Sequence, residues 1–492
     1  MTHKNKDIDA IVIGAGMAGI SSAIRLAHKG VHVTVYEQQD TYGGKMGVWE
    51  QDGYRYDTGP SLFTMPQYVT ELLTIDGKSD VKLDYSELDS ICNYFWEDGT
   101  RMTATKDRDQ LKEEFLKQLN EPKENIEAFL EDSKTKFEIT NHVFLEKSLH
   151  KLKTYLSWST IKSFFSLSKV EVFKNMSARN EQRFENPKTV QFFNRYATYN
   201  GSSPYQAPAT LNVIPHYEFG FGAFFPTNGI RSIADSLYQK AIRLGVDFQF
   251  SSSVHTVDKI ANKYLVNGSV ESDILVCNMD VASAAKGPLK KFISSKREKY
   301  EPSSSALIFY WGMDREFAEL DLHNIFFSNN YKKEFETIFH SKKIDDDPTV
   351  YIHISSKCKA DDAPQGCENW FVMVNAPYAD GQDWEKVIRE TRENIVTKLN
   401  KVLGLDISKH IQLEHKLTPE LIQSKTGSYK GALYGSSSND KMAAFLRQPN
   451  FSSENKGLYF CGGSVHPGGG IPLCLLSGKI TTDIIARDFK LH

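Results

Sequence analysis

A glycine-rich turn near the start of the chain has the residue types and spacing to bind a diphosphate. Its residues are Gly14, Ala15, Gly16, Met17, Ala18 and Gly19. The apolar, mostly β-branched run before it and the helical spacing of apolar residues after it predict a strand-to-helix turn. Gly14 permits the tight turn, Gly16 lets the backbone approach a pyrophosphate, and Gly19 lets the helix pack closely on the strand. The helix N-terminus supplies N–H groups and a positive dipole end to the phosphates.

Two further features indicate which dinucleotide this turn binds. Residues 32–36 alternate as a second strand, and Glu37 follows, where an acidic side chain accepts hydrogen bonds from an adenosine ribose and argues against a 2′-phosphate. Gly43, Gly44 and Lys45 then form a second loop, where backbone and a cation approach a diphosphate. A plain NAD site needs no such loop, so these features favour FAD. The alternative is an ordinary βαβ unit that uses its glycines only for packing.

Composition limits the classes of protein that the chain can belong to. With 492 residues it is expected to form two domains, and its net charge of -3 gives no sign of a nucleic-acid partner. It has no run of 18 or more apolar residues, and its nearest approach to a signal peptide, residues 10–24, follows acidic residues and contains the glycine turn. The six cysteines lack CxxC or metal spacing, which predicts reduced thiols in a cytoplasm and no metal site. Cys474 could tether a flavin, but a small buried hydrophobe is the preferred interpretation.

Residues 47–66 are expected to lie beside the diphosphate loops. Residues 48–56 alternate as a hairpin that turns at Asp52 and Gly53. In the loop that follows, Ser61 is expected to cap a helix that begins at residue 67. Because this loop is close to the diphosphate glycines, Ser61 and Leu62 are candidate contacts for the cofactor or its substrate.

Residues 106–200 are predicted to be mainly helical, and part of this region is basic and amphipathic. Residues 141–176 carry six lysines against Glu146 and Glu171, interleaved with Trp158 and many other aromatic and aliphatic residues. Such a composition is typical of a helix that lies in an anionic bilayer surface. The alternative is a core helix with a solvated lysine face.

The second half of the chain returns to strands after a turn-rich linker at residues 199–209. A helix at residues 230–244 precedes an alternating segment at 246–250 and a strand at 252–260. That strand is expected to return to the first sheet and present backbone to the adenine, which makes Val254 a candidate. Asn278 ends a buried run, where ligands of open α/β sheets bind. Strands within residues 303–374 suggest a second sheet, and a helix follows at 384–402.

Residues 457–472 combine a strand, a glycine-rich loop and the start of an Ile/Leu-rich helix. This arrangement brings N–H donors to the isoalloxazine end of a flavin. Gly463, Gly470 and Ile471 are the residues predicted to contact it. His466, flanked by Pro467, is interpreted as a loop residue that shapes the site and not as an acid or base.

Taken together, these segments resemble the bacterial-type phytoene (carotenoid) desaturase family of FAD enzymes, nearly from end to end. The resemblance is carried by residues 14–19, 57–66, 199–209, 323–327, 363–370 and 466–472. The first motif is shared by all flavin oxidoreductases of this fold, and the last is specific to carotenoid desaturases together with residues 363–370. Lys45 stands where the family more often has arginine, and Thr227-Asn228 replaces a more usual Lys-Gly or Gly-Gly. Within the family, the general pattern is most similar to 1-hydroxycarotenoid 3,4-desaturases.

The resemblance implies an α/β fold. It consists of an FAD-binding Rossmann-like domain of the GR2/amine-oxidase type and a discontinuous second, substrate-binding domain of mixed sheet and helices. The FAD-binding domain would comprise residues 8–75, 225–300 and 440–492. A helical region that contacts substrate and membrane would span residues 76–224, and a substrate-binding sheet region would span residues 301–439.

The resemblance also implies an activity, the FAD-dependent introduction of a C–C double bond into a C40 carotenoid, with 3,4-desaturation of a 1-hydroxycarotenoid as the specific expectation. A hydride would pass from an allylic carbon to flavin N5, a proton would leave the adjacent carbon, and oxygen or a membrane quinone would reoxidise the flavin. No residue stands out as a general base. A water-insoluble substrate favours the membrane-surface interpretation of residues 141–176, and hence a cytoplasmic protein associated peripherally with the inner face of the cell membrane.

Three alternatives stay open from the sequence. They are a phytoene- or lycopene-type desaturase of another carotenoid, a flavin-dependent carotenoid isomerase without net redox change, and a flavin-free prenyl-lipid escort protein. Glu37 and the C-terminal glycine loop argue against the flavin-free protein.

Overall fold

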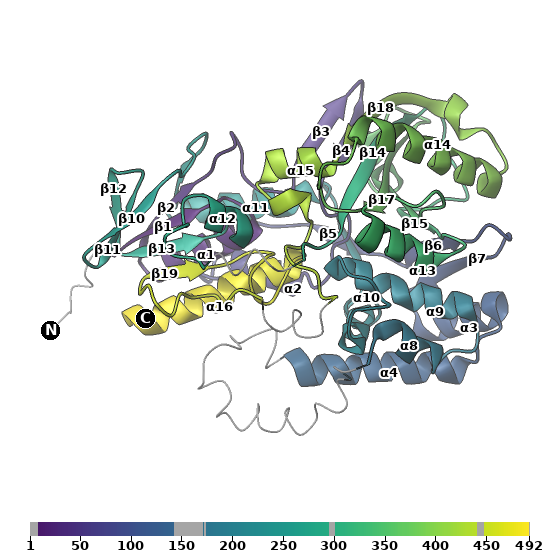
Figure 1. Ribbon diagram of the computed structural model, residues 1–492, viewed down its shortest axis with the longest axis horizontal. Helices are drawn as coiled ribbons and strands as arrows, with labels where there is room; N and C mark the ends of the chain where they lie inside the picture. The colour runs from purple at the N-terminus through teal and green to yellow at the C-terminus, as the bar shows by residue number, and fades with distance from the viewer. Residues whose placement is uncertain (1–7, 142–170, 172–173, 295–300, 440–446, 492) are drawn as a thin grey trace.

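A five-stranded parallel sheet forms one half of the molecule, and distant parts of the chain assemble it (Figure 1). The structure is a computed structural model that describes residues 8–141, 171, 174–294, 301–439 and 447–491. The strand order is β19 (Leu458–Phe460), β13 (Ile274–Cys277), β1 (Asp9–Ile13), β2 (His32–Tyr36) and β9 (Asp247–Gln249). The carboxyl ends of all five strands therefore meet at one edge of the sheet.

Both faces of this sheet are covered, which explains why β1 reads as a continuous apolar run. Ala10 and Val12 pack against α1 (Met17–His28), α11 (Arg231–Arg243) and α16 (Ile471–Phe489). Ile11 and Ile13 pack on the other face, against α12 (Val281–Lys286) and the small antiparallel sheet of β10 (Val257–Ile260), β11 (Lys263–Val266) and β12 (Val270–Ser272). The predicted strand-turn-helix-strand unit is confirmed.

One predicted strand pairing is wrong. Residues 252–260 do not return to the first sheet, because β9 occupies the position beside β2, and β10 pairs with β11. The short turns between β10, β11 and β12 allow a local antiparallel meander, which needs no crossover connection. The segment of Val254 therefore lies between the two sheets.

A seven-stranded sheet forms the other half of the molecule. Its order is β18 (Ile411–Leu417), β14 (Ser305–Met313), β17 (Glu368–Ala376), β16 (Val350–Ile354), β15 (His323–Phe326), β6 (Ser90–Phe95) and β7 (Arg101–Thr105). Neighbours are antiparallel except β15 and β6. The second sheet predicted within residues 303–374 is confirmed, and α14 (Trp384–Leu403) packs on it. Two of its strands come from residues 90–105, and the domain boundaries remain a prediction.

A group of helices lies beside the β6–β7 end of the seven-stranded sheet, at the lower right of Figure 1. They are α3 (Arg108–Leu119), α4 (Lys123–Thr140), α8 (Met176–Glu181), α9 (Pro187–Asn194) and α10 (Pro215–Phe219). The mainly helical character predicted for residues 106–200 is confirmed for the described part of that range. The predicted membrane-surface helix at 141–176 falls largely on residues 142–170 and 172–173, which lie outside the described residues.

The remaining short elements connect these layers. They are the hairpin of β3 (Val48–Gln51) and β4 (Tyr54–Asp57), the pair β5 (Tyr85–Glu87) and β8 (Phe224–Pro226), and the helices α2 (Gln67–Leu73), α13 (Tyr331–Glu336) and α15 (Pro419–Thr426). The predicted turn at Asp52 and Gly53 is confirmed, with positive φ at both residues.

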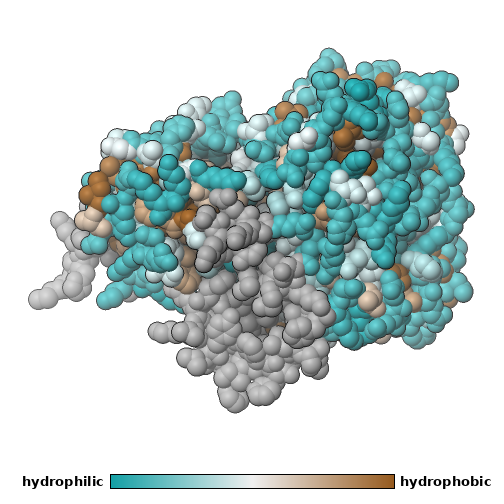
Figure 2. All heavy atoms as spheres, viewed as in Figure 1, coloured by the Kyte–Doolittle hydropathy of each residue, from teal (hydrophilic) through white to brown (hydrophobic). Residues whose placement is uncertain are grey.

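The face of the molecule in Figure 2 is mostly hydrophilic, with hydrophobic residues gathered only in small separate patches. Within the described part of the chain, none of the helices combines the length and the apolar character needed to traverse a bilayer.

Candidate functional site

The turn between β1 and α1 has no room for side chains at its glycines. Gly14 has φ +100°, a conformation that glycine adopts at no steric cost. A Cβ on Gly19 would lie 2.1 Å from the carbonyl oxygen of Gly14, and one on Gly16 would lie 3.0 Å from Asn278 Nδ2. The first turn of α1 contains no acidic residue, so its positive end is uncompensated. The turn therefore offers bare backbone and N–H groups to an anionic ligand.

Glu37 is buried and fixed beside this turn. One carboxylate oxygen accepts a hydrogen bond from Ala15 N at 2.8 Å, and the other accepts one from Gln39 N at 3.0 Å. Each oxygen retains lone pairs, so the carboxylate can still accept hydrogen bonds from the hydroxyls of a ribose. Ser252 N donates to the Glu37 carbonyl at 2.8 Å, which brings the segment leading to Val254 to the same end of the site.

Asn278 connects the glycine loops from the two ends of the chain. It follows β13, and its Nδ2 donates to the Gly14 carbonyl at 3.1 Å. A Cβ on Gly462 would lie 2.8 Å from Asn278 Oδ1, so the C-terminal loop also packs against this side chain. Asn278 therefore contacts both glycine loops at the carboxyl edge of the parallel sheet.

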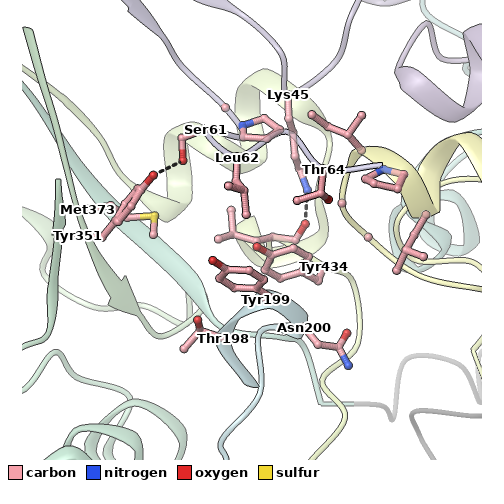
Figure 3. A pocket seen from close by; sticks show the side chains of 18 of the residues that line it. Lys45, Ser61, Leu62, Thr64, Thr198, Tyr199, Asn200, Tyr351, Met373 and Tyr434 are labelled. Carbon is pink, nitrogen blue, oxygen red and sulfur yellow. Dashed lines mark hydrogen bonds between the residues drawn. The ribbon is translucent and has the colours of Figure 1, made fainter. Parts of the chain in front are cut away.

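The second predicted loop lies directly against the first. Gly43 N donates to the Ala15 carbonyl at 2.9 Å, and a Cβ on Gly44 would lie 3.2 Å from Gly16 Cα. The half-buried Lys45 side chain extends away from the turn, and its Nζ donates to the Leu433 carbonyl at 2.7 Å (Figure 3). Burial lowers the Lys45 pKa, and the nearby Asp280 carboxylate opposes this shift. Gly44 and Lys45 thus join the glycine turn to a large cavity.

This cavity has a volume of about 710 Å³, within the range usual for small-molecule sites. Of the predicted contacts, Gly44, Lys45, Ser61, Leu62, Gly470 and Ile471 line it. Much of the remaining wall is apolar and aromatic, with contributions from Ile91, Leu211, Ile214, Tyr217, Ile308, Tyr310, Phe371 and Met373. Figure 3 shows Ser61 and Leu62 on one side of the cavity and Tyr199 on the other.

The predicted capping role of Ser61 is wrong. Helix α2 begins after Pro66 without a side-chain cap, because Ser61 is too far back along the chain to reach its first N–H groups. Ser61 Oγ instead forms a 2.7 Å hydrogen bond with the Tyr351 hydroxyl, which also bonds His323 Nδ1 at 2.7 Å. Burial keeps the pKa of His323 well below its usual value, so its imidazole is neutral.

Cys474 lies in the first turn of α16 as a free, half-buried thiol. Burial raises its pKa to about 11, so the sulfur stays protonated at neutral pH. This supports its interpretation as a small hydrophobe.

Most of the predicted site residues fall into two neighbouring groups, and Gly463 and Val254 belong to neither. Gly14 to Gly19, Glu37 and Asn278 lie at the carboxyl edge of the parallel sheet, whereas six others line the cavity. Gly463 lies behind the cavity wall, where its carbonyl accepts a hydrogen bond from Arg447. Val254 packs in the apolar cluster that contains Ile13. This elongated arrangement fits FAD, with its diphosphate at the glycine turn and its ring in the cavity.

The cavity wall contains a buried ionic cluster that was not predicted from the sequence. Glu218 accepts hydrogen bonds from Arg195 at 3.2 Å and from the hydroxyls of Tyr196 and Tyr199, both at 2.6 Å. Arg195, Tyr199 and Glu218 line the cavity. Burial raises the pKa of the Tyr199 phenol well above its usual value, so the hydroxyl remains protonated. Tyr199 is the first residue of the motif at residues 199–209, but no local sequence pattern indicates that Arg195 pairs with Glu218.

Glu334 is expected to make the free energy of unfolding depend on pH. It is buried, and its Oε2 accepts a 2.7 Å hydrogen bond from Thr349, which lines the cavity. Burial raises its pKa from 4.5 to about 7. Because the folded-state pKa is raised, the stability contributed by the protonated carboxyl is complete below pH 4.5 and is lost as pH rises through about 7.

Urea unfolding at about pH 5 and about pH 8 measures this effect. Glu334→Gln is expected to be more stable relative to the wild type at the higher pH than at the lower one. Glu336→Gln, at the exposed end of the same helix, serves as the control and should show no such difference. An equal stability difference between Glu334→Gln and wild type at both pH values would contradict the prediction.

Comparison with known proteins places this geometry in a family. The pattern of the family described as "Flavin containing amine oxidoreductase" matches residues 17–486. The chain is 46% identical to a 1-hydroxycarotenoid 3,4-desaturase from Flavobacterium sp. (strain P99-3) over 97% of this chain and 98% of the relative. It is 32% identical to a 4,4'-diapolycopene oxygenase from Methylomonas sp. over 99% of this chain and 100% of the relative.

Solved structures agree on the fold. A double mutant of putrescine oxidase superposes with a TM-score of 0.65 at 13% identity, over 98% of this chain and 99% of that one. Cyclohexylamine oxidase from Brevibacterium oxydans IH-35A superposes with a TM-score of 0.62 at 14% identity, over 99% and 100%. The predicted Rossmann-like amine-oxidase-type fold and the FAD cofactor are confirmed. From its glycine turn to its last helix, this chain belongs to the flavin-containing amine oxidoreductase family and is similar over nearly its whole length to enzymes named carotenoid desaturases and oxygenases.

Proposed function

We propose that this protein is an FAD-dependent carotenoid desaturase, and specifically a 3,4-desaturase of 1-hydroxycarotenoids. The observation that carries the proposal is the 46% identity, over 97% of the chain, to an enzyme of that name. The apolar cavity supports a polyene substrate, because a long hydrocarbon needs a wall that offers dispersion contacts and excludes water. The buried cluster of Arg195, Tyr199 and Glu218 supports a hydroxylated substrate.

The chain's own residues position the reaction. Bound FAD would supply the acceptor for the hydride that leaves the substrate carbon. Gly14 to Gly19 and Glu37 would hold its diphosphate and ribose, and the loop before α16 would orient its ring. The apolar wall around Leu62 and Met373 orients the polyene against that loop and keeps water out.

The cavity wall also contains a chain of hydrogen-bonded polar groups. Ser61, Tyr351 and His323 form a continuous chain of hydrogen bonds, and Ser61 and His323 both line the cavity. Because burial keeps the His323 imidazole neutral, this chain does not store a proton but fixes the Ser61 and Tyr351 hydroxyls at the cavity wall.

The cluster of Arg195, Tyr199 and Glu218 is the proposed binding site for the substrate hydroxyl. The Tyr199 hydroxyl donates to Glu218 and accepts from Arg195 Nη1 at 2.8 Å, which leaves it one lone pair. A carotenoid hydroxyl that reaches this wall can donate to that lone pair. A hydrocarbon end group in the same place leaves that lone pair without a donor, which disfavours its binding.

Tyr199→Phe is expected to reduce selectivity for the hydroxylated substrate by about tenfold, the equivalent of one hydrogen bond to a charged network. The measurement is the ratio of kcat/KM for a 1-hydroxycarotenoid and for the same carotenoid without the hydroxyl. Tyr217→Phe removes another cavity phenol outside the cluster and should leave that ratio unchanged. An equal loss on both substrates in Tyr199→Phe would contradict the assignment.

Incubation of the purified protein with FAD and a 1-hydroxycarotenoid tests the function directly. We expect a yellow protein that absorbs at about 450 nm and a product lighter by two hydrogens with a red-shifted polyene spectrum. A product of unchanged mass and altered geometry would indicate an isomerase, a gain of oxygen would indicate an oxygenase, and turnover confined to non-hydroxylated carotenoids would indicate another desaturase. A colourless protein that takes up no FAD would indicate an escort protein.

We further propose that the enzyme works at the inner face of the cell membrane and passes its electrons to oxygen or a quinone. The basic amphipathic composition of residues 141–176 and the insolubility of a carotenoid in water support this location. Flotation with anionic vesicles is expected to carry the protein upward at low salt and less so at high salt. Flotation that is absent at every salt concentration would contradict the proposal.

A further inference from the structure

Arg447 is a buried cation that carbonyl and amide oxygens surround. The residue as a whole is 4% exposed. Nη1 donates to the carbonyls of Tyr434 at 2.8 Å and Gly463 at 3.0 Å. Nη2 donates to Asn200 Oδ1 at 2.7 Å and to the Ser436 carbonyl at 3.3 Å. All these acceptors are uncharged, so among the described residues no carboxylate neutralises this guanidinium.

The other buried arginines among the described residues are paired with carboxylates. Arg195 is paired with Glu218 and Arg25 with Glu71, and the partly buried Arg55 is paired with Asp57 and Asp362. A charge that is buried without a counter-charge costs several kcal/mol, even when its hydrogen bonds are satisfied. Burial accordingly lowers the pKa of Arg447 to about 10. A ligand with negative charge would remove this cost.

The position of Arg447 indicates where that negative charge would lie. Arg447 lines the cavity, and a Cβ on Gly468 would lie 3.5 Å from its guanidinium carbon. It therefore contacts the glycine loop that leads into the N-terminus of α16, the predicted isoalloxazine end of the cofactor. The positive end of a 19-residue helix points to the same place.

Lys45 approaches the same edge of the cavity from the diphosphate side. Lys45 Nζ binds the carbonyl of Leu433, and Arg447 binds the carbonyl of the next residue, Tyr434. Figure 3 shows Lys45, Tyr434 and Asn200 along one side of the cavity. The two cations thus flank one strip of backbone, with Lys45 nearer the glycine turn and Arg447 nearer the C-terminal loop.

We propose that Arg447 is a positioning residue that neutralises the negative charge of the reduced flavin ring and thereby raises the reduction potential of the bound FAD. A ring that gains a hydride gains one negative charge, and a fixed guanidinium beside it stabilises that form over the neutral oxidised form. This inference rests on FAD binding and is independent of which carotenoid is the substrate.

Matched variants of the holoenzyme test this assignment. Arg447→Gln keeps amide donors for the surrounding carbonyls but removes the charge, Arg447→Lys keeps the charge but loses the planar fork, and Lys45→Gln removes the neighbouring cation. Equilibration with reference dyes gives the reduction potential, and fluorescence titration gives the dissociation constant of oxidised FAD.

We expect Arg447→Gln to shift the potential to more negative values, and both Arg447→Lys and Lys45→Gln to shift it less. Three outcomes would overturn the proposal. The first is an unchanged potential in Arg447→Gln. The second is a loss of affinity for oxidised FAD in Arg447→Gln without a potential shift, which would place the charge at the diphosphate. The third is a potential shift in Lys45→Gln equal to that in Arg447→Gln.

A second test uses the wild-type holoenzyme, so it does not require any variant to fold. A guanidinium beside the ring keeps the reduced flavin anionic to lower pH. The reduction potential should therefore fall with pH at the slope for one proton per two electrons from about pH 6 to about pH 8. A slope for two protons at the acid end of this range would overturn the proposal. Carotenoid turnover enters neither test, so the inference and the proposed function can fail separately.

Discussion

Gly19→Ala is expected to abolish FAD binding. The added methyl carbon would lie 2.1 Å from the Gly14 carbonyl oxygen and 2.9 Å from Asn278 Nδ2. The first atom is backbone within the same turn, so rotation of a side chain cannot relieve the contact, and α1 must move away from β1. This movement displaces the N–H groups that are expected to meet the diphosphate. The ratio of flavin to protein absorbance after purification, together with the melting temperature, measures the result.

Gly30→Ala is the matched control for this variant. Gly30 follows the same helix and has φ +79°, but an added Cβ would meet nothing within 4 Å. Its substitution should cost about 1 kcal/mol of stability through backbone strain and leave the flavin content intact. Full flavin content in a folded Gly19→Ala variant would show that the turn does not bind the diphosphate.

The features of this structure that the sequence could predict are local ones. The β1 strand, its glycine turn and α1 depend on residues that are neighbours in the chain, and period and spacing are sufficient to identify them. The C-terminal strand, loop and helix are of the same kind. Ser61 and Val254 show the limit, because Ser61 does not cap α2 and the strand that follows Val254 does not return to the first sheet.

The wall of the cavity could not be predicted, because it forms between segments that are far apart in the chain. Ser61 bonds Tyr351, which is 290 residues away, and Lys45 bonds the Leu433 carbonyl, which is 388 residues away. No periodicity signals such contacts. The pairing of Arg195 with Glu218 and the neutral surroundings of Arg447 depend on tertiary packing, and in the sequence each is only a charged residue among many.

The second large effect is expected from Glu218→Gln, which should lower the free energy of unfolding by about 3–5 kcal/mol. Glu218 is 1% exposed and neutralises Arg195, which is 4% exposed. Glutamine has the same shape as glutamate but no charge. Its NH₂ group is a donor, and it would face the hydroxyls and the guanidinium that now donate to the carboxylate. The variant therefore leaves a buried guanidinium unpaired and at least one phenol without an acceptor. The midpoint and slope of urea unfolding give the loss.

A double-mutant cycle with Arg195→Met separates the cost of the orphaned charge from general disruption of the core. If the charge dominates, the double variant Arg195→Met/Glu218→Gln should be less destabilised than the sum of the two single variants by more than about 1 kcal/mol, because neither charge is then left alone. Additive losses would show that the pair contributes packing and no mutual stabilisation. Since the same carboxylate accepts from Tyr199 in the cavity wall, loss of selectivity for a substrate hydroxyl should accompany the loss of stability in Glu218→Gln. Stability lost without that change in selectivity would confine the cluster to a structural role.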